Sequence, residues 1–320
     1  MRVISASRRT DIAAFYSRWL LARLRAGYCH VADPFGGRLF RVPLRPEDVV
    51  ALALFTRDPR PLLPHLPALM AEGYRVYAHV TVNGYQRTLE PRSPWLPRAT
   101  AAVRCLSGVL GSEAVVWRYD PIVLAEDTPE GWHVARFAGI AERLEGAVDR
   151  CVISFVDRYR KTERNLDAVG VRPDWEVGHR HLALATELAG IAFEHGIEVR
   201  SCAEEALGAA GVAPGACLDR ELLACLRPDL ELHLRVTPTR AACACCEATD
   251  IGVYQTCGFG CAYCYATDSP AIGLAHLREH DPEDSIMWRP PALRGVDLDE
   301  VAETPREPRV GVEPDDPALF

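Results

Sequence analysis

The residues with the clearest chemical potential are three cysteines near the end of the chain. Cys257, Cys261 and Cys264 lie in the segment TCGFGCAYCYA, with Tyr263 immediately before the third cysteine. Packing of a hydrophobic core does not explain thiols so closely spaced, whereas metal or cluster binding does. The glycines 258 and 260 let the backbone wrap tightly, so that its N–H groups can point toward the sulfurs.

The spacing of these cysteines discriminates among metal sites. Structural zinc is enclosed by four ligands, often two CxxC pairs, and a ferredoxin cluster takes four cysteines. Here one CxxxC and one CxxC share Cys261. Three thiolates from one loop favour a [4Fe–4S] cluster with one iron left open, which is a catalytic arrangement.

A second set of cysteines lies in the preceding part of the chain: Cys202, Cys217, Cys243 and Cys245. Four thiolates suffice for an auxiliary [4Fe–4S] cluster or for a structural zinc ion. Separate, unconnected thiols are the third interpretation, and Cys246 can replace a neighbour. The remaining cysteines lie in apolar runs and are expected in the core: Cys29, Cys105, Cys151 and Cys225.

Alternating strands and helices must position these groups. The patterns predict strands over 2–7, 49–56, 74–82, 114–120, 150–157 and 197–202, and helices over 13–27, 61–73, 97–111, 131–146 and 181–196. This alternation predicts an α/β fold with a parallel sheet. Because no phosphate-binding GxGxxG or GxxxxGK[ST] motif follows the first strand, a partial barrel is favoured over a nucleotide-binding fold.

The predicted strands end in polar residues, and such ends gather at one edge of a parallel sheet. The basic excess suits a carboxylate or phosphate ligand, although each residue alone could be a helix cap or a turn residue. The residues are Arg8, Arg9, Asp11, Thr56, Arg57, Thr81, Asn83, Arg118, Asp120, Ser154, Asp157 and Arg158.

Composition narrows the functional classes. The chain has 320 residues and a net charge of −8, which argues against a general nucleic-acid binder. Neither a signal peptide nor a run of about 18 apolar residues is visible, so a cytoplasmic protein without a membrane span is expected. In a reducing compartment the 12 cysteines are metal ligands or core residues rather than disulfides.

The CxxxCxxC motif with an aromatic residue before the third cysteine resembles that of the radical S-adenosylmethionine (radical SAM) superfamily, especially its spore photoproduct lyase-like branch. Further segments resembling that branch are SRRTDI, FTRDP, LEPRSPWLPRA and WRYDPIV, so the similarity covers most of residues 1–270. Arg57 stands where lysine is common, which keeps the charge but changes its geometry.

The order of these segments is unusual, because the cysteine loop of that superfamily follows the first barrel strand. Here DIGVYQT (250–256) would be that first strand, moved to the C-terminal end. The chain resembles an uncharacterised bacterial domain-of-unknown-function family with this permuted order and a frequent photolyase-like DNA-repair label. The pattern CxCxxxxDIGxYxTCxxGCxYCYA of that family matches residues 243–266, and its further cysteines match the second set.

The resemblance implies a circularly permuted, partial TIM-like (β/α) barrel. Its parts would be a barrel over 1–201, a cysteine-containing insert over 202–249, and the permuted strand, loop and helix over 250–288. The Pro-rich, acidic composition of 289–320 predicts a solvated, flexible tail, with a short helix near 297–302.

The implied activity is reductive cleavage of S-adenosylmethionine, giving a 5′-deoxyadenosyl radical that takes a hydrogen atom from an unknown substrate. Cys257, Cys261 and Cys264 would bind the cluster. The expected cofactor-binding residues are Thr56, Arg57, Thr81 and Tyr263, and the expected catalytic residues are Arg8, Arg9, Asp11, Arg118 and Asp157. In that interpretation Arg57 binds the methionine carboxylate and Tyr263 packs near the adenine.

The expected partners are a small-molecule or nucleic-acid-derived substrate and an electron donor such as flavodoxin or ferredoxin. Two alternatives stay open: an iron–sulfur electron-transfer or redox-sensing protein, and a zinc-stabilised nucleic-acid-binding module.

Overall fold

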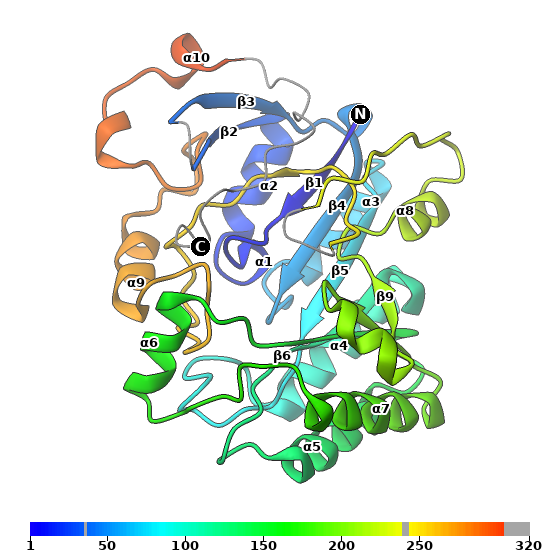
Figure 1. Cartoon of the computed structure of the whole chain (residues 1–320). Coiled ribbons are helices and arrows are strands. Elements are labelled where there is room, and N and C mark those ends of the chain that lie inside the picture. The colour runs from blue at the N-terminus through cyan, green and yellow to red at the C-terminus, as the bar shows by residue number, and fades with distance from the viewer. Residues whose placement is uncertain (35–36, 239–242, 304–320) are drawn as a thin grey trace.

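A parallel sheet of eight strands forms the centre of the molecule (Figure 1). The computed structural model describes residues 1–34, 37–238 and 243–303. The strand order is β10-β1-β4-β5-β6-β7-β8-β9, and every neighbouring pair is parallel. The strands are β1 Arg2–Ala6, β4 Val49–Thr56, β5 Val76–Thr81, β6 Val115–Ile122, β7 Arg150–Phe155, β8 Glu198–Cys202, β9 Ala213–Gly215 and β10 Thr249–Asp250.

Helices connect these strands, and an antiparallel hairpin lies outside the sheet. The helices are α1 Ile12–Phe15, α2 Ser17–Ala26, α3 Leu66–Ala71, α4 Leu96–Leu110, α5 Glu130–Leu144, α6 Arg160–Ala168, α7 His179–Glu194, α8 Arg220–Leu226, α9 Pro270–Glu279 and α10 Leu298–Val301. The hairpin consists of β2 Tyr28–Ala32 and β3 Leu39–Pro43. Short 3-10 helices span Pro46–Asp48, Leu63–His65, Ser112–Ala114, Glu205–Ala210 and Pro291–Leu293.

The predicted α/β class with a parallel sheet is confirmed, and the six predicted strands agree with the structure to within two residues. Among the described residues the sheet is open, with β9 and β10 at its edges. The hairpin and α6 were not predicted, because their apolar patterns are short.

Three local predictions were wrong. The helix expected over 13–27 is divided at Tyr16, whose φ of −126° ends α1 before α2 begins. The strand expected over 250–256 is only β10, which ends at Asp250. Beyond it the chain passes close to the loop after β1: a Cβ on Gly252 would lie 2.0 Å from the Ser7 hydroxyl oxygen. Cys105 and Cys225 are exposed rather than core residues, whereas Cys29 and Cys151 are buried as expected.

Apolar side chains cover both faces of the sheet, which is typical of a parallel sheet. One face packs against helices in a cluster that includes Ile4, Leu52, Trp117, Phe137 and Leu188. The other face packs against the segment that carries the second cysteine set, in a cluster that includes Tyr77, Val116, Leu223 and Cys217. The cysteine-containing segment therefore forms the second layer over the sheet.

The segment after α9 returns to the hairpin near the start of the chain (Figure 1). The Glu303 backbone N–H donates to the Leu39 carbonyl at 2.8 Å, and Leu298 is buried against Leu39. The short helix expected near 297–302 is present as α10. The remaining part of the predicted tail, 304–320, lies outside the described residues.

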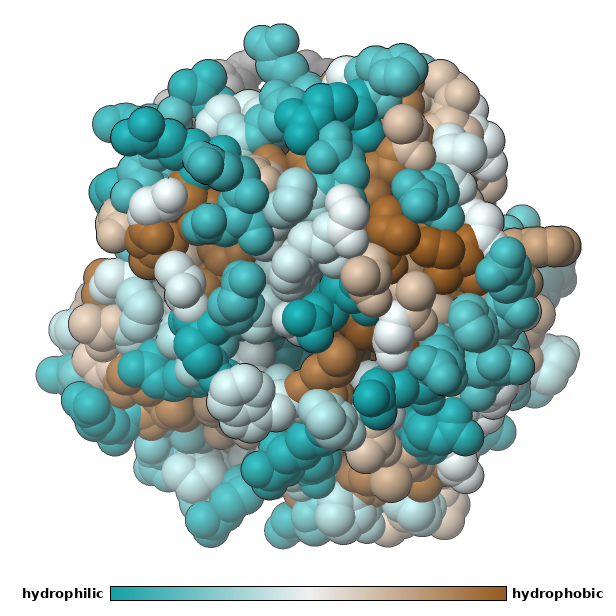
Figure 2. Space-filling view, turned by 90° about the horizontal axis from the view of Figure 1, so that it is seen from below, coloured by the Kyte–Doolittle hydropathy of each residue, from teal (hydrophilic) through white to brown (hydrophobic). Residues whose placement is uncertain are grey.

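The strands in Figure 1 run toward the lower side of the view, which Figure 2 shows face-on. Hydrophilic and apolar side chains are mixed on this face, around a recess near its centre. Within the part of the chain that the structure describes, no helix has both the length and the apolar character needed to cross a membrane.

Candidate functional site

The cysteine loop is fastened to the body of the protein at its base and at its tip. The Gln255 N–H donates to the Ala266 carbonyl at 2.9 Å, which closes the base. The Tyr16 hydroxyl donates to the Thr256 carbonyl at 2.6 Å, and the Phe259 ring packs against Phe15 with centroids 4.6 Å apart. The loop is therefore held against α1.

Asp250 joins the strand before this loop to the strand at the start of the chain. Its carboxylate is buried and accepts hydrogen bonds from the Ser5 hydroxyl at 2.8 Å and the Ser7 hydroxyl at 2.6 Å. It also accepts from the backbone N–H groups of Arg8 and Gly252, each at 2.9 Å. The segment beginning at Asp250 therefore lies beside the first strand, and the loop enters the same sheet edge as the residues after β1.

The three loop thiols are half-buried and lie within electrostatic reach of one another. Burial raises the pKa of Cys257 well above its usual range, and Cys264, Asp11 and Cys261 raise it further. Burial raises the pKa of Cys261 to about 12, although the Arg57 guanidinium opposes the rise and Ser93 hydrogen-bonds this thiol. Thiols that disfavour one another's charged form require a cation or a metal centre to become thiolates.

The three thiols of this loop are one ligand fewer than a structural zinc ion takes. Among the described residues, no three His, Cys, Asp or Glu side chains stand in ligand geometry around one ion. An iron–sulfur cluster places a different requirement on its ligands, because each thiolate binds a separate iron and the sulfurs need not converge on one point. The half-buried thiols supply the donor type that such a cluster takes.

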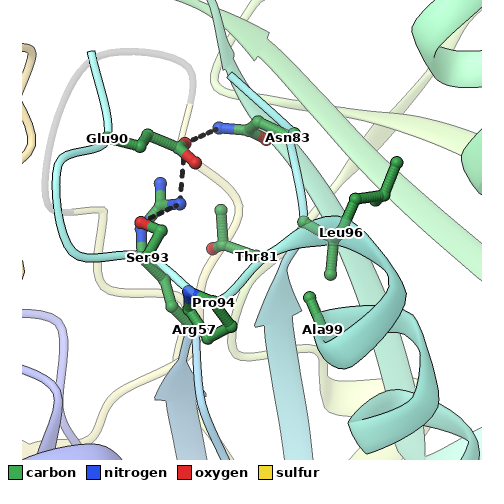
Figure 3. A pocket seen from close by; sticks show the side chains of 10 residues that line it. Arg57, Thr81, Asn83, Glu90, Ser93, Pro94, Leu96 and Ala99 are labelled. Carbon is green, nitrogen blue, oxygen red and sulfur yellow. Dashed lines mark hydrogen bonds and ion pairs between the residues drawn. The ribbon is translucent and has the colours of Figure 1, made fainter. Parts of the chain in front are cut away.

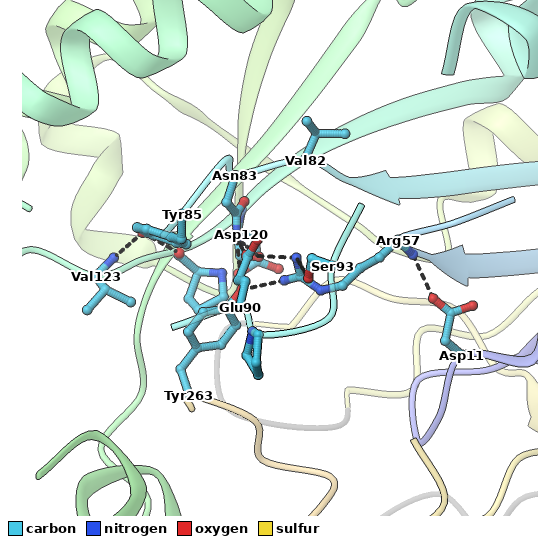
Figure 4. Close-up of polar contacts among 12 residues, drawn as sticks. Asp11, Arg57, Val82, Asn83, Tyr85, Glu90, Ser93, Asp120, Val123 and Tyr263 are labelled. Carbon is cyan, nitrogen blue, oxygen red and sulfur yellow. Dashed lines mark hydrogen bonds and ion pairs between the residues drawn. The ribbon is translucent and has the colours of Figure 1, made fainter. Parts of the chain in front are cut away.

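Arg57, expected to bind a carboxylate, is already paired with one (Figure 4). Its Nη1 lies 2.7 Å from Glu90 Oε1, and their side chains are only 12% and 5% exposed. The Tyr263 hydroxyl contacts both Arg57 and Glu90, and Asn83 Nδ2 lies 3.2 Å from the same hydroxyl. A carboxylate ligand would therefore have to share Arg57 with Glu90 or displace it.

Glu90 is the site residue that the sequence predictions missed. It lies in the quoted segment LEPRSPWLPRA, but a single glutamate before a proline gives no indication of its partner. Nor does the sequence show that the Tyr263 hydroxyl, at the end of a ring expected to pack near adenine, takes part in a buried polar network.

A small pocket opens beside this network (Figure 3). Thr81, predicted to bind a cofactor, lines the pocket together with Arg57, Asn83 and Glu90. Leu96 and Ala99 of α4 form its apolar wall. The pocket thus combines one apolar side with a charged and hydrogen-bonding side.

Asp11 holds Arg57 in place through the Arg57 backbone N–H, and Thr56 hydrogen-bonds the Asp11 carboxylate. Asp11 Oδ2 accepts from the Arg57 N–H at 2.6 Å, and Oδ1 accepts from the Ala14 N–H at 2.9 Å, which caps α1. Burial raises the pKa of Asp11 to about 7, while the hydrogen bonds from Arg57 and Thr56 oppose this rise. Asp11 therefore ties the first helix to the end of β4.

The remaining predicted catalytic residues occupy different surroundings. Arg118 pairs with Asp120, which also accepts a hydrogen bond from Ser154. Arg8 is half-buried after β1, and the Arg9 guanidinium lies over the Tyr254 ring at 5.4 Å. Asp157 is exposed just after β7, where the Tyr159 hydroxyl approaches it at 3.4 Å.

The second cysteine set is brought together on the other side of Arg118. Cys202 Sγ lies 3.3 Å from Cys217 Sγ, and Cys217 also hydrogen-bonds Cys245. Cys245 in turn hydrogen-bonds Cys243. All four predicted members are therefore linked, and Arg118 Nη1 reaches Cys217 Sγ at 2.8 Å.

A comparison with protein families matches residues 3–266 to the family described as domain of unknown function (DUF1848). The chain belongs to this family. The DUF1848 match includes both cysteine sets and ends at Ala266, the last residue of the cysteine-loop pattern. A search of curated proteins finds no match.

Proposed function

We propose that this DUF1848 protein is a radical SAM enzyme built on a permuted, partial (β/α) barrel, and that it acts in the cytoplasm. The observation that carries the proposal is the position of the CxxxCxxC loop. The loop follows a strand paired in parallel with β1, and its half-buried thiols lie within electrostatic reach of Asp11 and Arg57, after β1 and β4. Active sites of α/β proteins collect at this edge of a sheet.

In this proposal Cys257, Cys261 and Cys264 would hold a [4Fe–4S] cluster. With S-adenosylmethionine and an electron from a flavodoxin or ferredoxin, the bound cluster would supply the 5′-deoxyadenosyl radical. The positive charge of Arg57 near Cys261 offsets the negative charge that the thiolates bring. Ser93 donates a hydrogen bond to the Cys261 sulfur, a contact that tunes cluster potentials.

The other residues of the site position and shield these groups. The buried network of Arg57, Glu90 and Tyr263 would shield one side of the loop from water. Thr81 and Asn83 present polar groups to the adjoining pocket. Arg8 and Arg118 bring positive charge to the opposite side, where Asp250 and Asp120 partly offset it. In this proposal the two guanidinium groups face an anionic substrate.

Anaerobic reconstitution with iron and sulfide tests the proposal. We expect about four irons per chain in the loop site, and formation of 5′-deoxyadenosine from S-adenosylmethionine under a strong reductant. Cys261→Ala should abolish both the binding of iron by the loop and the formation of 5′-deoxyadenosine. Cys105→Ala is the matched control, because Cys105 is exposed on α4 and belongs to neither cysteine set.

Two outcomes would count against the proposal in different ways. An iron–sulfur cluster that neither binds nor cleaves S-adenosylmethionine would support the electron-transfer alternative. A protein whose loop takes up no iron and that leaves S-adenosylmethionine intact would exclude both interpretations.

A further inference from the structure

The four thiols outside the loop form a compact group supplied by three separate segments. Cys202 ends β8, and Cys217 lies between β9 and α8. Cys243 and Cys245 come from the segment that precedes β10. Sulfur contacts link them in the order Cys202, Cys217, Cys245, Cys243, and the first of these contacts measures 3.3 Å.

Hydrogen bonds to the backbone fix this group on the sheet. The Cys217 carbonyl accepts from the Tyr77 hydroxyl at 3.2 Å and from His79 Nε2 at 2.8 Å, both on β5. The Cys246 N–H donates to the Leu218 carbonyl at 3.0 Å, which joins the two cysteine-containing segments. Buried hydrogen bonds thus fix Cys217 on the sheet and join its segment to that of Cys245.

Positive charge and a backbone N–H lie beside these sulfurs. Arg118 Nη1 lies 2.8 Å from Cys217 Sγ, and the Leu218 N–H donates to the Cys245 sulfur. The Arg8 charge also acts on both Cys245 and Cys217. Two guanidinium groups and a backbone N–H beside four sulfurs are the surroundings that a metal centre with four anionic ligands requires.

We infer that Cys202, Cys217, Cys243 and Cys245 bind one structural zinc ion. Zinc bonds to sulfur are about 2.3 Å long, which places the sulfurs of a tetrahedral site about 3.8 Å apart. The 3.3 Å contact between Cys202 and Cys217 therefore needs to lengthen by about half an ångström. The sulfurs around a [4Fe–4S] cluster must lie much farther apart, because each binds a different iron.

Some spreading of the sulfurs is needed, since among the described residues no three such side chains yet stand in ligand geometry about one ion. The bound ion would clamp three segments together beneath Arg118 and Asp120. Its role is structural, because four thiolates leave zinc no open position for a substrate. This inference does not depend on the proposed radical chemistry.

Metal analysis of a triple variant separates the two cysteine sets. Cys257→Ser, Cys261→Ser and Cys264→Ser together remove the loop ligands, and this protein, purified from zinc-supplemented cells, should still contain about one zinc per chain. Adding Cys217→Ser should reduce the zinc at least tenfold. Adding Cys225→Ser to the triple variant instead should leave its zinc content unchanged, because Cys225 is exposed and lies outside both sets.

Cobalt substitution keeps the test decisive if the Cys217→Ser protein fails to fold. Replacing zinc by Co²⁺ in the triple variant should give the intense charge-transfer absorption of tetrahedral thiolate coordination. Iron and sulfide in the triple variant in place of zinc, or the absence of any bound metal, would overturn the inference. Failure of the cysteine loop to bind iron in the parent protein would count against the proposed radical SAM function alone. It would leave the zinc inference unaffected.

Discussion

At the scale of single residues, Arg57 shows how far a side chain's role depends on its surroundings. Its position after a predicted strand suggested a cation available to a ligand carboxylate. The structure instead gives it a carboxylate of its own, Glu90, together with the hydroxyl of Tyr263. A buried ion pair is costly to break, so these residues act as a fixed unit.

Glu90→Gln tests this unit by removing its only carboxylate charge. We expect the free energy of unfolding to fall by about 3 kcal/mol, because the buried Arg57 charge loses its partner. Urea unfolding of the apo protein measures the effect. Glu163→Gln is the matched control: Glu163 also lies 2.7 Å from an arginine, Arg158, but that pair is exposed and should contribute less than about 1 kcal/mol. Equal losses in the two variants would contradict the assignment of a buried unit.

At the scale of elements, α9 sets the position of the cysteine loop. Its residue Gly273 lies so close to the loop that a Cβ would stand 2.2 Å from the Cys257 carbonyl oxygen. The loop and the helix that follows it therefore pack backbone against backbone at this point. The pattern of apolar residues does not predict such a contact, because glycine contributes no side chain to the pattern.

Gly273→Ala should therefore push Cys257 out of place. We expect a loss of about 1–3 kcal/mol in unfolding free energy and a marked fall in reconstituted iron. Gly139→Ala in α5 is the control, because nothing lies within 4 Å of the added Cβ. That change should stabilise the helix by about 0.5–1 kcal/mol and leave the iron content unchanged. Unaltered iron binding in Gly273→Ala would show that the contact does not position the loop.

At the scale of the whole molecule, backbone pairing joins segments that are distant along the chain. β10 pairs with β1, and residues near Glu303 pair with the hairpin formed by β2 and β3. Protonation of a single buried group should therefore lower the free energy of unfolding of the whole chain. His133 is such a group: its Nε2 donates to the Val123 carbonyl at 3.1 Å, and its Nδ1 accepts from the Tyr119 hydroxyl at 2.8 Å.

Burial lowers the pKa of His133 from 6.5 to about 4, so between these two pH values its neutral form predominates in the folded chain and its charged form in the unfolded chain. Its contribution is complete above pH 6.5 and is lost as the pH falls toward 4. This loss amounts to about 3 kcal/mol of unfolding free energy. His133→Phe should flatten the pH dependence by this amount, whereas His65→Gln, at an exposed position, should follow the parent curve. Parallel curves for His133→Phe and the parent would contradict the buried neutral state.

The sequence by itself determined the parallel α/β class, the six long strands and the two cysteine sets. These depend on local periodicity and spacing, which the order of residues records directly. Arg57 was placed correctly after β4, because strand ends are local features too.

Only the tertiary structure decided the partners: Glu90 for Arg57, Gly273 for Cys257, and Arg118 for Cys217. Each of these contacts joins segments distant along the chain, and nothing in either segment specifies the other. The same holds for β10, whose two residues become a strand through pairing with β1 rather than through any propensity of their own. Contacts of this kind form only when the hydrophobic core has fixed both segments in space.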